Sequence, residues 1–324
     1  MRAVICPEYG PPEVLRVDQR PPPAPSAGQA RVRVEAAAVN FPDVLLIADK
    51  YQVSVPPPFV PGSEFAGVVE EVNEPGGEFD VGDRVTGAGL CGAFAEQVVI
   101  PTASLSHIPP GIDTLAAAAF GVAHRTAYHS LRSVARVQPG EELIVLGAGG
   151  GIGLAAVQLG VVLGASVTAV ASSQEKLSAA ARYGACHVVN HRTGDLRAAL
   201  REAVPGGADA VIDPVGGQLS EPALRALRRG GRFVTLGYAS GVIPRIPLNL
   251  VLMKGVHVLG FQFQDLAPDE FRRNEVQLRD LQATGRVTPH VGARFPLDRT
   301  AEALRLVADG AAIGKVVVEV SSPG

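Results

Sequence analysis

A glycine-rich segment, from Gly147 to Gly153, is the clearest candidate for a binding site in this sequence. It follows the apolar stretch 143–146 and precedes the helical stretch 154–163, after which residues 165–170 read as a second strand. Glycine lets a tight turn bring its backbone against a pyrophosphate, whose oxygens then accept hydrogen bonds from the N–H groups that open the helix. This order predicts a dinucleotide site, although the spacing G-x-x-G-x-x-G departs from the common G-x-G-x-x-G. The residues expected to contact the phosphates are Ala148, Gly149, Gly150, Gly151 and Ile152.

The end of the second strand, at Ser172, carries no acidic residue. A site specific for NAD places Asp or Glu there to bind the ribose 2′-hydroxyl, whereas a 2′-phosphate requires hydroxyl and cationic donors. Ser172 and Lys176 lie at this position, and His191 or Arg192 reaches the same corner if the third strand lies beside the second. Lys176 and Arg192 could also be ordinary solvated charges. The missing acid favours NADPH as the cofactor.

The rest of the chain shows no nucleophile–base arrangement and no paired-carboxylate motif. Its three cysteines, Cys6, Cys91 and Cys186, are too widely separated to suggest a disulfide framework or a C-x-x-C metal site. This pattern suits an enzyme in which a bound cofactor performs the difficult step and the protein positions the reactants.

The glycine segment belongs to a region of alternating strands and helices, which predicts a doubly wound parallel sheet of the Rossmann type. The expected helices are 173–183 and 194–204, and the expected later strands are 187–190, 210–213, 232–236 and 256–261. Residues before about 120 show short strands separated by glycine and proline, which is typical of a β-barrel-like domain. Helical stretches at 113–120 and 126–131 separate the two regions. Two more helices, 268–284 and 299–309, precede a strand at 315–320 that we expect to return to the first domain.

Length and charge limit the kind of protein. The 324 residues are enough for two domains, with expected segments 1–122, 123–264 and 265–324. A net charge of −3 gives no electrostatic reason to expect nucleic acid as a partner. No apolar run reaches the length of a membrane span, so we expect a cytoplasmic protein.

Several motifs occur together in an order that resembles the medium-chain dehydrogenase/reductase superfamily, and more closely its zinc-free quinone oxidoreductases, which include zeta-crystallin. The resemblance implies a GroES-like catalytic domain made by both chain ends, with a Rossmann domain inserted between them and the active site in the cleft. It also implies a homodimer whose Rossmann sheets meet edge to edge near residues 256–261. The motifs are Asn40-Phe-Pro-Asp43, Pro61-Gly-Ser-Glu-Phe-Ala-Gly67, Val81-Gly-Asp-Arg-Val85, Gly147 to Gly153, Asp213-Pro-Val-Gly-Gly217 and Gly314-Lys315.

The resemblance also implies roles for individual residues. Asn40, Asp43 and Tyr51 would line the substrate cleft beside the nicotinamide, with Tyr51 as the proton donor unless water takes that part. Thr126 would contact the nicotinamide ribose or amide, and Lys315 would lie near the pyrophosphate or the nicotinamide end. The remaining cofactor contacts expected from the family are Asn40, Val215, Gly237, Tyr238, Phe261 and Phe263.

Two positions depart from the zinc-dependent alcohol dehydrogenases that this superfamily also contains. Those enzymes have a cysteine ligand where this chain has Asn40, and a histidine where it has Ser63. Zinc sites need three or four sulfur, imidazole or carboxylate ligands held together. We therefore predict that the protein uses no metal.

The leading hypothesis is hydride transfer from NADPH to a quinone or another α,β-unsaturated carbonyl. A first alternative is reduction of a 2-enoyl thioester, for which Arg245, Arg272 and Arg273 are candidates for a basic rim around the phosphates. A second alternative is a structural or regulatory protein that binds NADPH without turnover, as lens crystallins of this family do.

Overall fold

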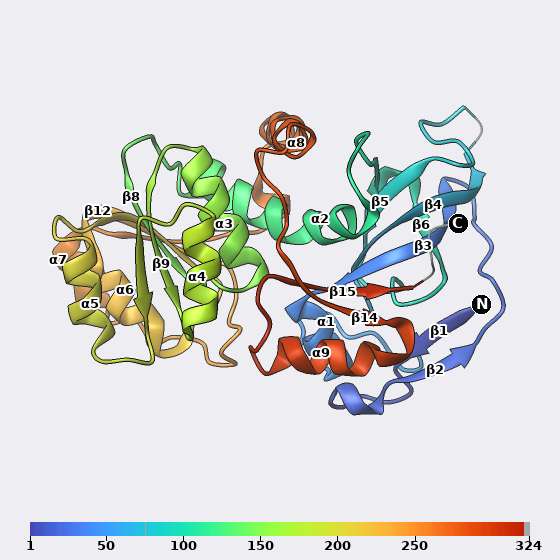
Figure 1. The fold of residues 1–324 in the computed structure, drawn as a ribbon, viewed down its shortest axis with the longest axis horizontal. Coiled ribbons are helices and arrows are strands. Elements are labelled where there is room, and N and C mark those ends of the chain that lie inside the picture. The colour runs from blue at the N-terminus through green and yellow to red at the C-terminus, as the bar shows by residue number, and fades with distance from the viewer. Residues whose placement is uncertain (75, 321–324) are drawn as a thin grey trace. The chain divides into compact units, whose positions relative to one another are not determined.

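The computed structural model describes residues 1–74 and 76–320, and the chain forms two compact units (Figure 1). Unit 1 contains Met1–Val122 and His290–Gly324, and unit 2 contains Ala123–Pro289. The chain enters unit 2 where we expected, but it returns to unit 1 at residue 290 instead of 265. Residues 265–289 stay in unit 2 because helix α8 (Pro268–Ala283) is hydrogen-bonded to the helix that opens that unit.

Unit 2 is built on a parallel sheet of strands β8 (Glu142–Leu146), β9 (Ser166–Ala171), β10 (His187–Asn190), β11 (Ala208–Asp213), β12 (Leu227–Thr235) and β13 (His257–Gly260). Over the described residues the spatial order is β10-β9-β8-β11-β12-β13, and each adjacent pair is parallel. In chain order this is 3-2-1-4-5-6, which is the doubly wound order. The predicted Rossmann sheet is therefore confirmed.

Helices cover both faces of this sheet. Figure 1 shows α3 (Gly151–Val162) and α4 (Gln174–Arg182) on one side of the strands and α5 (Leu196–Ala203), α6 (Ser220–Ala226) and α7 (Leu248–Lys254) on the other. After Glu142 the central strand β8 is apolar, because both of its faces are covered. Residues 143–146 are completely buried.

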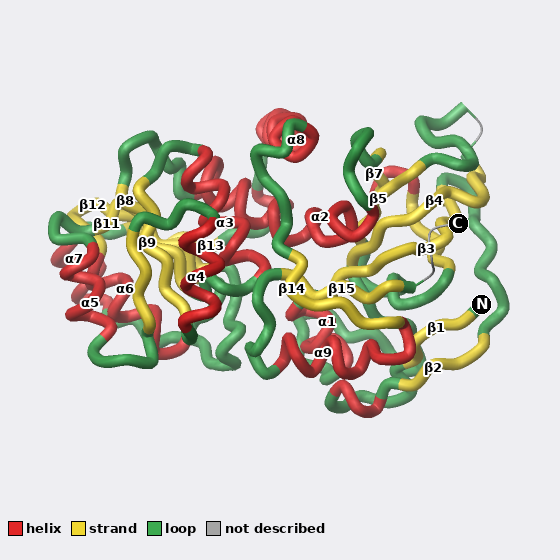
Figure 2. Tube along the Cα trace, in the orientation of Figure 1, coloured by secondary structure: helices red, strands yellow, loops and turns green. Residues whose placement is uncertain are grey.

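Unit 1 contains a sheet of strands β3 (Gln29–Val39), β4 (Glu64–Asn73), β5 (Arg84–Ala88), β6 (Gln97–Pro101), β7 (Leu105–His107), β14 (Val291–Pro296) and β15 (Lys315–Glu319). Its order over the described residues is β14-β15-β3-β4-β5-β7, with β6 also paired to β3. Strand β15 pairs antiparallel with β3, so the strand expected at 315–320 does return to the first domain. Strands β1 (Arg2–Ile5) and β2 (Arg16–Gln19) pair antiparallel with each other and form a separate two-stranded sheet (Figure 2).

Three further helices are α1 (Phe41–Ile47), α9 (Thr300–Ala308) and α2 (Thr114–His129). The helical stretches expected at 113–120 and 126–131 are one continuous helix, α2, which runs into a π-helical turn at Ser130–Val134. Gly121 lies inside this helix at a close approach, since a Cβ there would lie 3.1 Å from Glu64 Oε2. No helix in the described part of the chain is long and apolar enough to cross a bilayer.

Candidate functional site

The glycine turn joins β8 to α3 as a tight loop. Gly147 has a φ of 61°, in the left-handed region that favours glycine. The Ala148 N–H donates to Val170 O at 3.0 Å, which ties the turn to β9. Gly150 caps α3 in an extended conformation, and the first bond of the helix runs from Leu154 N to Gly150 O. The N–H groups of the first helical turn, residues 151–153, therefore have no partner within the helix, which suits an anion.

Steric limits explain why three of these positions are glycine. A Cβ on Gly153 would lie 2.0 Å from the Gly147 carbonyl oxygen, and one on Gly147 would lie 2.6 Å from Val215 Cγ2. A Cβ on Gly149 would lie 2.5 Å from both Cβ and Cγ of Lys176. The turn is thus packed between the opening of its own helix, the segment after β11 and the side chain of Lys176.

The expected 2′-phosphate corner is assembled within unit 2. Strand β10 lies beside β9 with Asn190 opposite Ala171, so the residues that follow both strands are neighbours. Ser172, Lys176 and His191 are each partly buried. Burial lowers the pKa of Lys176, and the charge of Arg192 lowers it further. Burial and Arg192 also lower the pKa of His191. These basic groups therefore disfavour one another's positive charge, and a phosphate dianion would relieve that repulsion.

Other predicted cofactor residues follow β11 and β12. Asp213 is fully buried, and its Oδ1 accepts hydrogen bonds at 2.8 Å from the N–H groups of Val215 and Gly216. This fixes the turn that presses Val215 on Gly147. Gly237 is partly buried, and Tyr238 is 37% exposed, so its ring is open to a ligand. Their cofactor contacts stay predictions.

Phe261 and Phe263, which we expected beside the cofactor, both contact the buried His129, and their cofactor contacts stay predictions. The Phe261 ring stacks on His129 with centroids 6.4 Å apart, and the Phe263 ring meets His129 edge-on at 5.8 Å. Phe271 of α8 also stacks on this histidine, at 5.0 Å. Phe263 keeps 40% of its surface exposed. Thr126, one turn earlier on α2, is partly buried, and its carbonyl accepts from the Ser130 hydroxyl.

Hydrogen bonds give His129 a structural role. Its Nε2 is 2.7 Å from Glu275 Oε1, and its Nδ1 is 3.2 Å from Asn274 Nδ2, which can only donate. The ring therefore accepts through Nδ1 and donates through Nε2. Burial raises the pKa of Glu275, but the hydrogen bond from His129 and the charge of Arg125 hold it below its usual value. The cluster joins α8 to α2.

Asn40, which we expected on the substrate side, lies in a buried polar cluster of unit 1. Asn40 precedes α1 as its N-cap, and Glu64 opens β4. The Lys315 ammonium, from β15, is 2.6 Å from both Asn40 Oδ1 and Glu64 Oε1. Asn40 Nδ2 donates to Glu64 Oε1 at 3.0 Å. From the sequence, Glu64 was noted only as part of a family motif and not as a site residue. The feature that could have indicated its role is a single carboxylate directly before the apolar run 65–69.

Asp43 lies beside this cluster, with 1% of its surface exposed. Its Oδ2 accepts a 2.7 Å hydrogen bond from the Asn40 backbone N–H, which closes the first turn of α1. Burial raises the pKa of Asp43 to about 7, against the lowering effects of the Asn40 N–H, the Ser63 hydroxyl and the Lys315 charge. Its carboxyl therefore exchanges a proton near neutral pH.

Tyr51 and Lys315 differ in their surroundings. The Tyr51 ring is partly buried against the apolar core of unit 1. Lys315 has 4% of its surface exposed. Its ammonium donates to Val39 O, Asn40 Oδ1 and Glu64 Oε1. Those three acceptors use all three of its N–H groups. Direct contacts of Lys315 and Tyr51 with ligands stay predictions.

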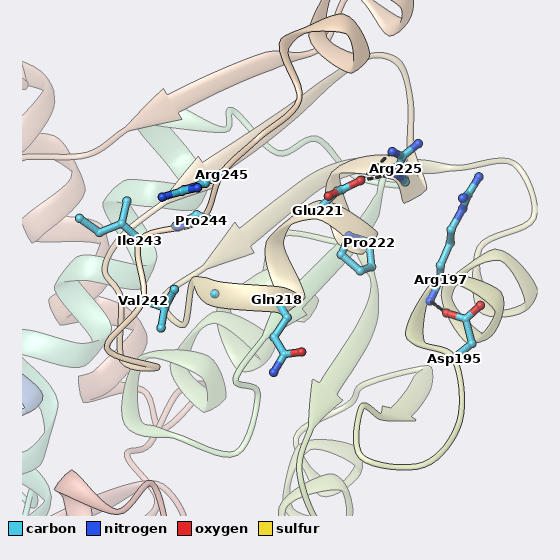
Figure 3. Close-up of a pocket in the computed structure, with 11 residues that line it drawn as sticks. Asp195, Arg197, Gln218, Glu221, Pro222, Arg225, Val242, Ile243, Pro244 and Arg245 are labelled. Carbon is cyan, nitrogen blue, oxygen red and sulfur yellow. Dashed lines mark hydrogen bonds and ion pairs between the residues drawn. The ribbon is translucent and has the colours of Figure 1, made fainter.

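Unit 2 also holds a cavity of about 720 Å³ between the start of α5, the start of α6 and the loop 242–245 (Figure 3). Arg245, which we considered for a phosphate rim, lines it together with Arg197 and Arg225. Glu221 also lines the cavity and pairs with Arg225 at 2.6 Å, so the basic charge is partly neutralised. Arg272 and Arg273 lie elsewhere, on α8.

The donor set in unit 1 does not fit a zinc ion. A cation on Glu64 would face the Lys315 ammonium, which already lies 2.6 Å from that carboxylate. Asn40 and Ser63 supply an amide and a hydroxyl, whereas zinc sites use thiolate, imidazole and carboxylate. Across the described residues, no three His, Cys, Asp or Glu side chains gather as metal ligands would.

Comparison with known proteins agrees with this architecture. Residues 26–110 match the alcohol dehydrogenase GroES-like domain, and residues 151–279 match the family described as zinc-binding dehydrogenase. These matches and the two units define a medium-chain dehydrogenase/reductase, which is an oxidoreductase.

The relatives specify the family further. The chain is 35% identical to quinone oxidoreductase-like protein 2 of Mus musculus, over 98% of this chain and 91% of that protein. The structure of Thermus thermophilus quinone oxidoreductase, also determined in complex with NADPH, is 32% identical, with a TM-score of 0.85 over 99% of this chain and 100% of that one. Escherichia coli quinone oxidoreductase complexed with NADPH gives a TM-score of 0.91 at 27% identity, over the same shares of the two chains. The chain belongs to the quinone oxidoreductase family, and the resemblance inferred from its motifs is confirmed.

Proposed function

We propose that this protein is a zinc-independent NADPH-dependent reductase of quinones or related α,β-unsaturated carbonyls. The observation that carries the proposal is the glycine turn of unit 2, whose α3 N-terminus and basic corner lie side by side. Two of the similar structures are NADPH complexes of quinone oxidoreductases, which supports the same cofactor here. Zinc independence is supported by the ammonium of Lys315 at the carboxylate where a metal would need to bind.

The residues of unit 2 bind and orient the cofactor in this proposal. The N–H groups of residues 151–153 receive the pyrophosphate, and Lys176, His191 and Arg192 receive the 2′-phosphate. The nicotinamide supplies the hydride when the cofactor is bound. Tyr238, Phe261 and Phe263 present partly exposed rings that would exclude water from it.

The residues of unit 1 act on the substrate side. Reduction of a conjugated carbonyl leaves an oxyanion that must be protonated. The Tyr51 hydroxyl is the proposed proton donor. Because the pKa of Asp43 is raised to about 7, this carboxyl can supply a proton to the site at neutral pH. Tyr51→Phe tests the first role: turnover should fall at least about a hundredfold, as loss of a general acid does. Unchanged turnover with a good acceptor would remove Tyr51 as an essential acid and leave water as the donor.

The decisive experiment is NADPH consumption with 1,4-benzoquinone, 9,10-phenanthrenequinone, a simple enone and crotonyl-CoA, each repeated with NADH. Fast quinone reduction with NADPH alone supports the proposal. A preference for crotonyl-CoA indicates the enoyl-thioester alternative. Tight NADPH binding without turnover of any acceptor indicates the non-catalytic alternative.

We also propose a homodimer joined through β13. This strand is one of the two edge strands of the described sheet, and its outer backbone groups can pair with another strand. Val258 on the edge is 46% exposed, and Leu252 and Met253 on the adjacent α7 are 83% and 67% exposed. A second copy would cover this apolar surface. Light scattering tests it: the wild type should have twice the monomer mass, and Val258→Lys should shift it toward the monomer. The cytoplasmic location stays a prediction.

A further inference from the structure

Three buried polar side chains form a closed triangle in unit 1. The Lys315 ammonium donates to Asn40 Oδ1 and to Glu64 Oε1, each at 2.6 Å. Asn40 Nδ2 donates to the same Glu64 oxygen at 3.0 Å. The exposed fractions of Asn40, Glu64 and Lys315 are 8%, 2% and 4%. These bonds are charge-assisted and shielded from water, which makes them stronger than ordinary surface contacts.

The two charges fix the orientation of the Asn40 carboxamide. If this group were rotated by half a turn, its NH₂ would face the Lys315 ammonium and its oxygen would face the Glu64 carboxylate. Both new contacts would be repulsive, a donor against a donor and an acceptor against an acceptor. The Ser63 hydroxyl adds a further acceptor for Nδ2, at 3.2 Å. Lys315 and Glu64 therefore determine which end of the amide is available to a ligand.

Glu64 must be a carboxylate for this arrangement, because both of its oxygens accept. Its Oε1 receives Lys315 and Asn40, and its Oε2 receives the Val122 backbone N–H at 2.7 Å. Glutamine has the same shape but would turn its NH₂ group toward one of these sets of donors. Glu64→Gln therefore leaves one set of donors facing an NH₂ group, with almost no change in volume.

We infer that Lys315 and Glu64 are positioning residues that act through Asn40. They hold the Asn40 amide so that one lone pair of Oδ1 remains to accept a hydrogen bond from a ligand. Both N–H groups of the amide are taken by Glu64 and Ser63, so a group that contacts Asn40 must bring an N–H or O–H donor. Lys315 has its own three N–H groups engaged and contributes by orienting the amide. The inference rests on the proposed reductase function, since it assigns residues to that same site.

A double-mutant cycle tests whether Lys315 acts through Asn40. Lys315→Met, Asn40→Ala and the double variant are compared by kcat/KM for NADPH oxidation with the best acceptor. Lys315→Met should lower kcat/KM about tenfold in the presence of Asn40, as loss of a ligand-orienting partner does. In the Asn40→Ala background the same change should cost less than about twofold, because the residue it positions is gone. Equal factors in the two backgrounds, or no effect in either, would overturn the inference.

Two further variants separate positioning from folding. Arg33→Met is the matched control, because it removes a 3.2 Å ion pair to Glu35 in the same sheet without touching Asn40. It should leave kcat/KM within about twofold of the wild type. If Lys315→Met leaves an uncompensated Glu64 charge and unfolds, the apolar pair Lys315→Met with Glu64→Leu replaces it in the cycle, since such replacements of buried ion pairs generally preserve the fold.

A spectroscopic readout keeps this inference distinct from the proposed activity. In protein labelled with ¹⁵N-asparagine, the Asn40 side-chain amide signal is the one that Asn40→Ala removes. It should shift in Lys315→Met and in Glu64→Gln and stay in place in Arg33→Met. If the wild type reduces no acceptor, the reductase proposal fails, while this measurement still decides whether Lys315 and Glu64 orient Asn40. An unmoved signal in both variants would refute the positioning role.

Discussion

The stem of Lys176 lies against the backbone of Gly149 so closely that no other residue type fits there. A Cβ on Gly149 would meet three carbons of that stem, at 2.5, 2.5 and 2.7 Å. These carbons belong to the near part of the side chain, which cannot move without changing where the ammonium lies. The glycine turn therefore positions a basic group as well as making room for a pyrophosphate.

Gly149→Ala should weaken NADPH binding about tenfold, equivalent to losing one charge-assisted hydrogen bond of about 1.5 kcal/mol. The affinity for NADH should change less, because NADH has no 2′-phosphate for Lys176 to bind. Fluorescence titration with each cofactor measures both. Gly206→Ala is the matched control, since a Cβ there meets nothing within 4 Å. Equal weakening of NADPH and NADH would show that the turn, and not Lys176, carries the effect.

NADPH affinity should depend on pH through His191. Burial and Arg192 lower the pKa of this histidine below its usual value of 6.5, so it is neutral in the free protein at neutral pH. A bound phosphate dianion favours the protonated ring, so binding takes up a proton, and the dissociation constant should rise as the pH is raised above the lowered pKa of the free histidine. His191→Gln should reduce this slope. An identical slope for the variant would assign it to another group.

Asp43→Asn should stabilise the protein, and increasingly so with pH. The folded pKa of Asp43 is raised from 3.8 to about 7. Between these values the unfolded chain is ionised and the folded one holds its proton, so wild-type stability falls as pH rises, by at most about 1.4 kcal/mol per pH unit. The variant lacks this loss and keeps an acceptor for the Asn40 N–H.

The measurement is the melting temperature of the two proteins at pH 4, 5, 6 and 8. The difference between variant and wild type should grow up to pH 7 and then level off. Asp265→Asn, at an exposed position, serves as the control and should show no such trend. A constant difference from pH 4 to 8 would mean that Asp43 titrates normally.

Asn274→Ala should destabilise unit 2 by about 2 to 3 kcal/mol, because it leaves two buried acceptors without a donor. Asn274 is 5% exposed and donates to His129 Nδ1 at 3.2 Å and to Ser133 Oγ at 2.8 Å. Urea unfolding measures the loss, with the exposed Arg273→Ala on the same helix as control. Equal midpoints for the two variants would contradict the structural role given to the histidine cluster.

The Rossmann sheet was predictable because its signals are local. The apolar stretch 143–146, the glycine turn and the helix after it are contiguous, and burial on both faces makes such a strand apolar throughout. The short helices α1 and α7 were not foreseen, since their seven residues complete fewer than two turns and show little periodicity. Strand β14 was missed because it contains glycine and proline, which are both rare in strands.

The candidate site could be predicted only as separate pieces. Asn40 and Lys315 were identified by family motifs, but the ion pair of Lys315 with Glu64 joins residues 251 apart and has no local signature. Phe261 and Phe263 were expected beside the cofactor, and their packing on His129 depends on where α8 lies. Side-chain chemistry is visible in a sequence, whereas the partner that each group finds depends on the tertiary fold.

The position of Lys315 on the last strand has a consequence for biosynthesis. Glu64 leaves the ribosome 251 residues before Lys315. At a synthesis rate of 5 to 20 residues per second this interval is about 13 to 50 s. During that interval the nascent chain contains the Glu64 carboxylate and the Asn40 amide but not yet Lys315, whose ammonium pairs with both. The Rossmann unit is complete by Pro289, before β15 emerges. The chain therefore completes its Rossmann unit before unit 1 can gain strand β15 and the Lys315 ammonium.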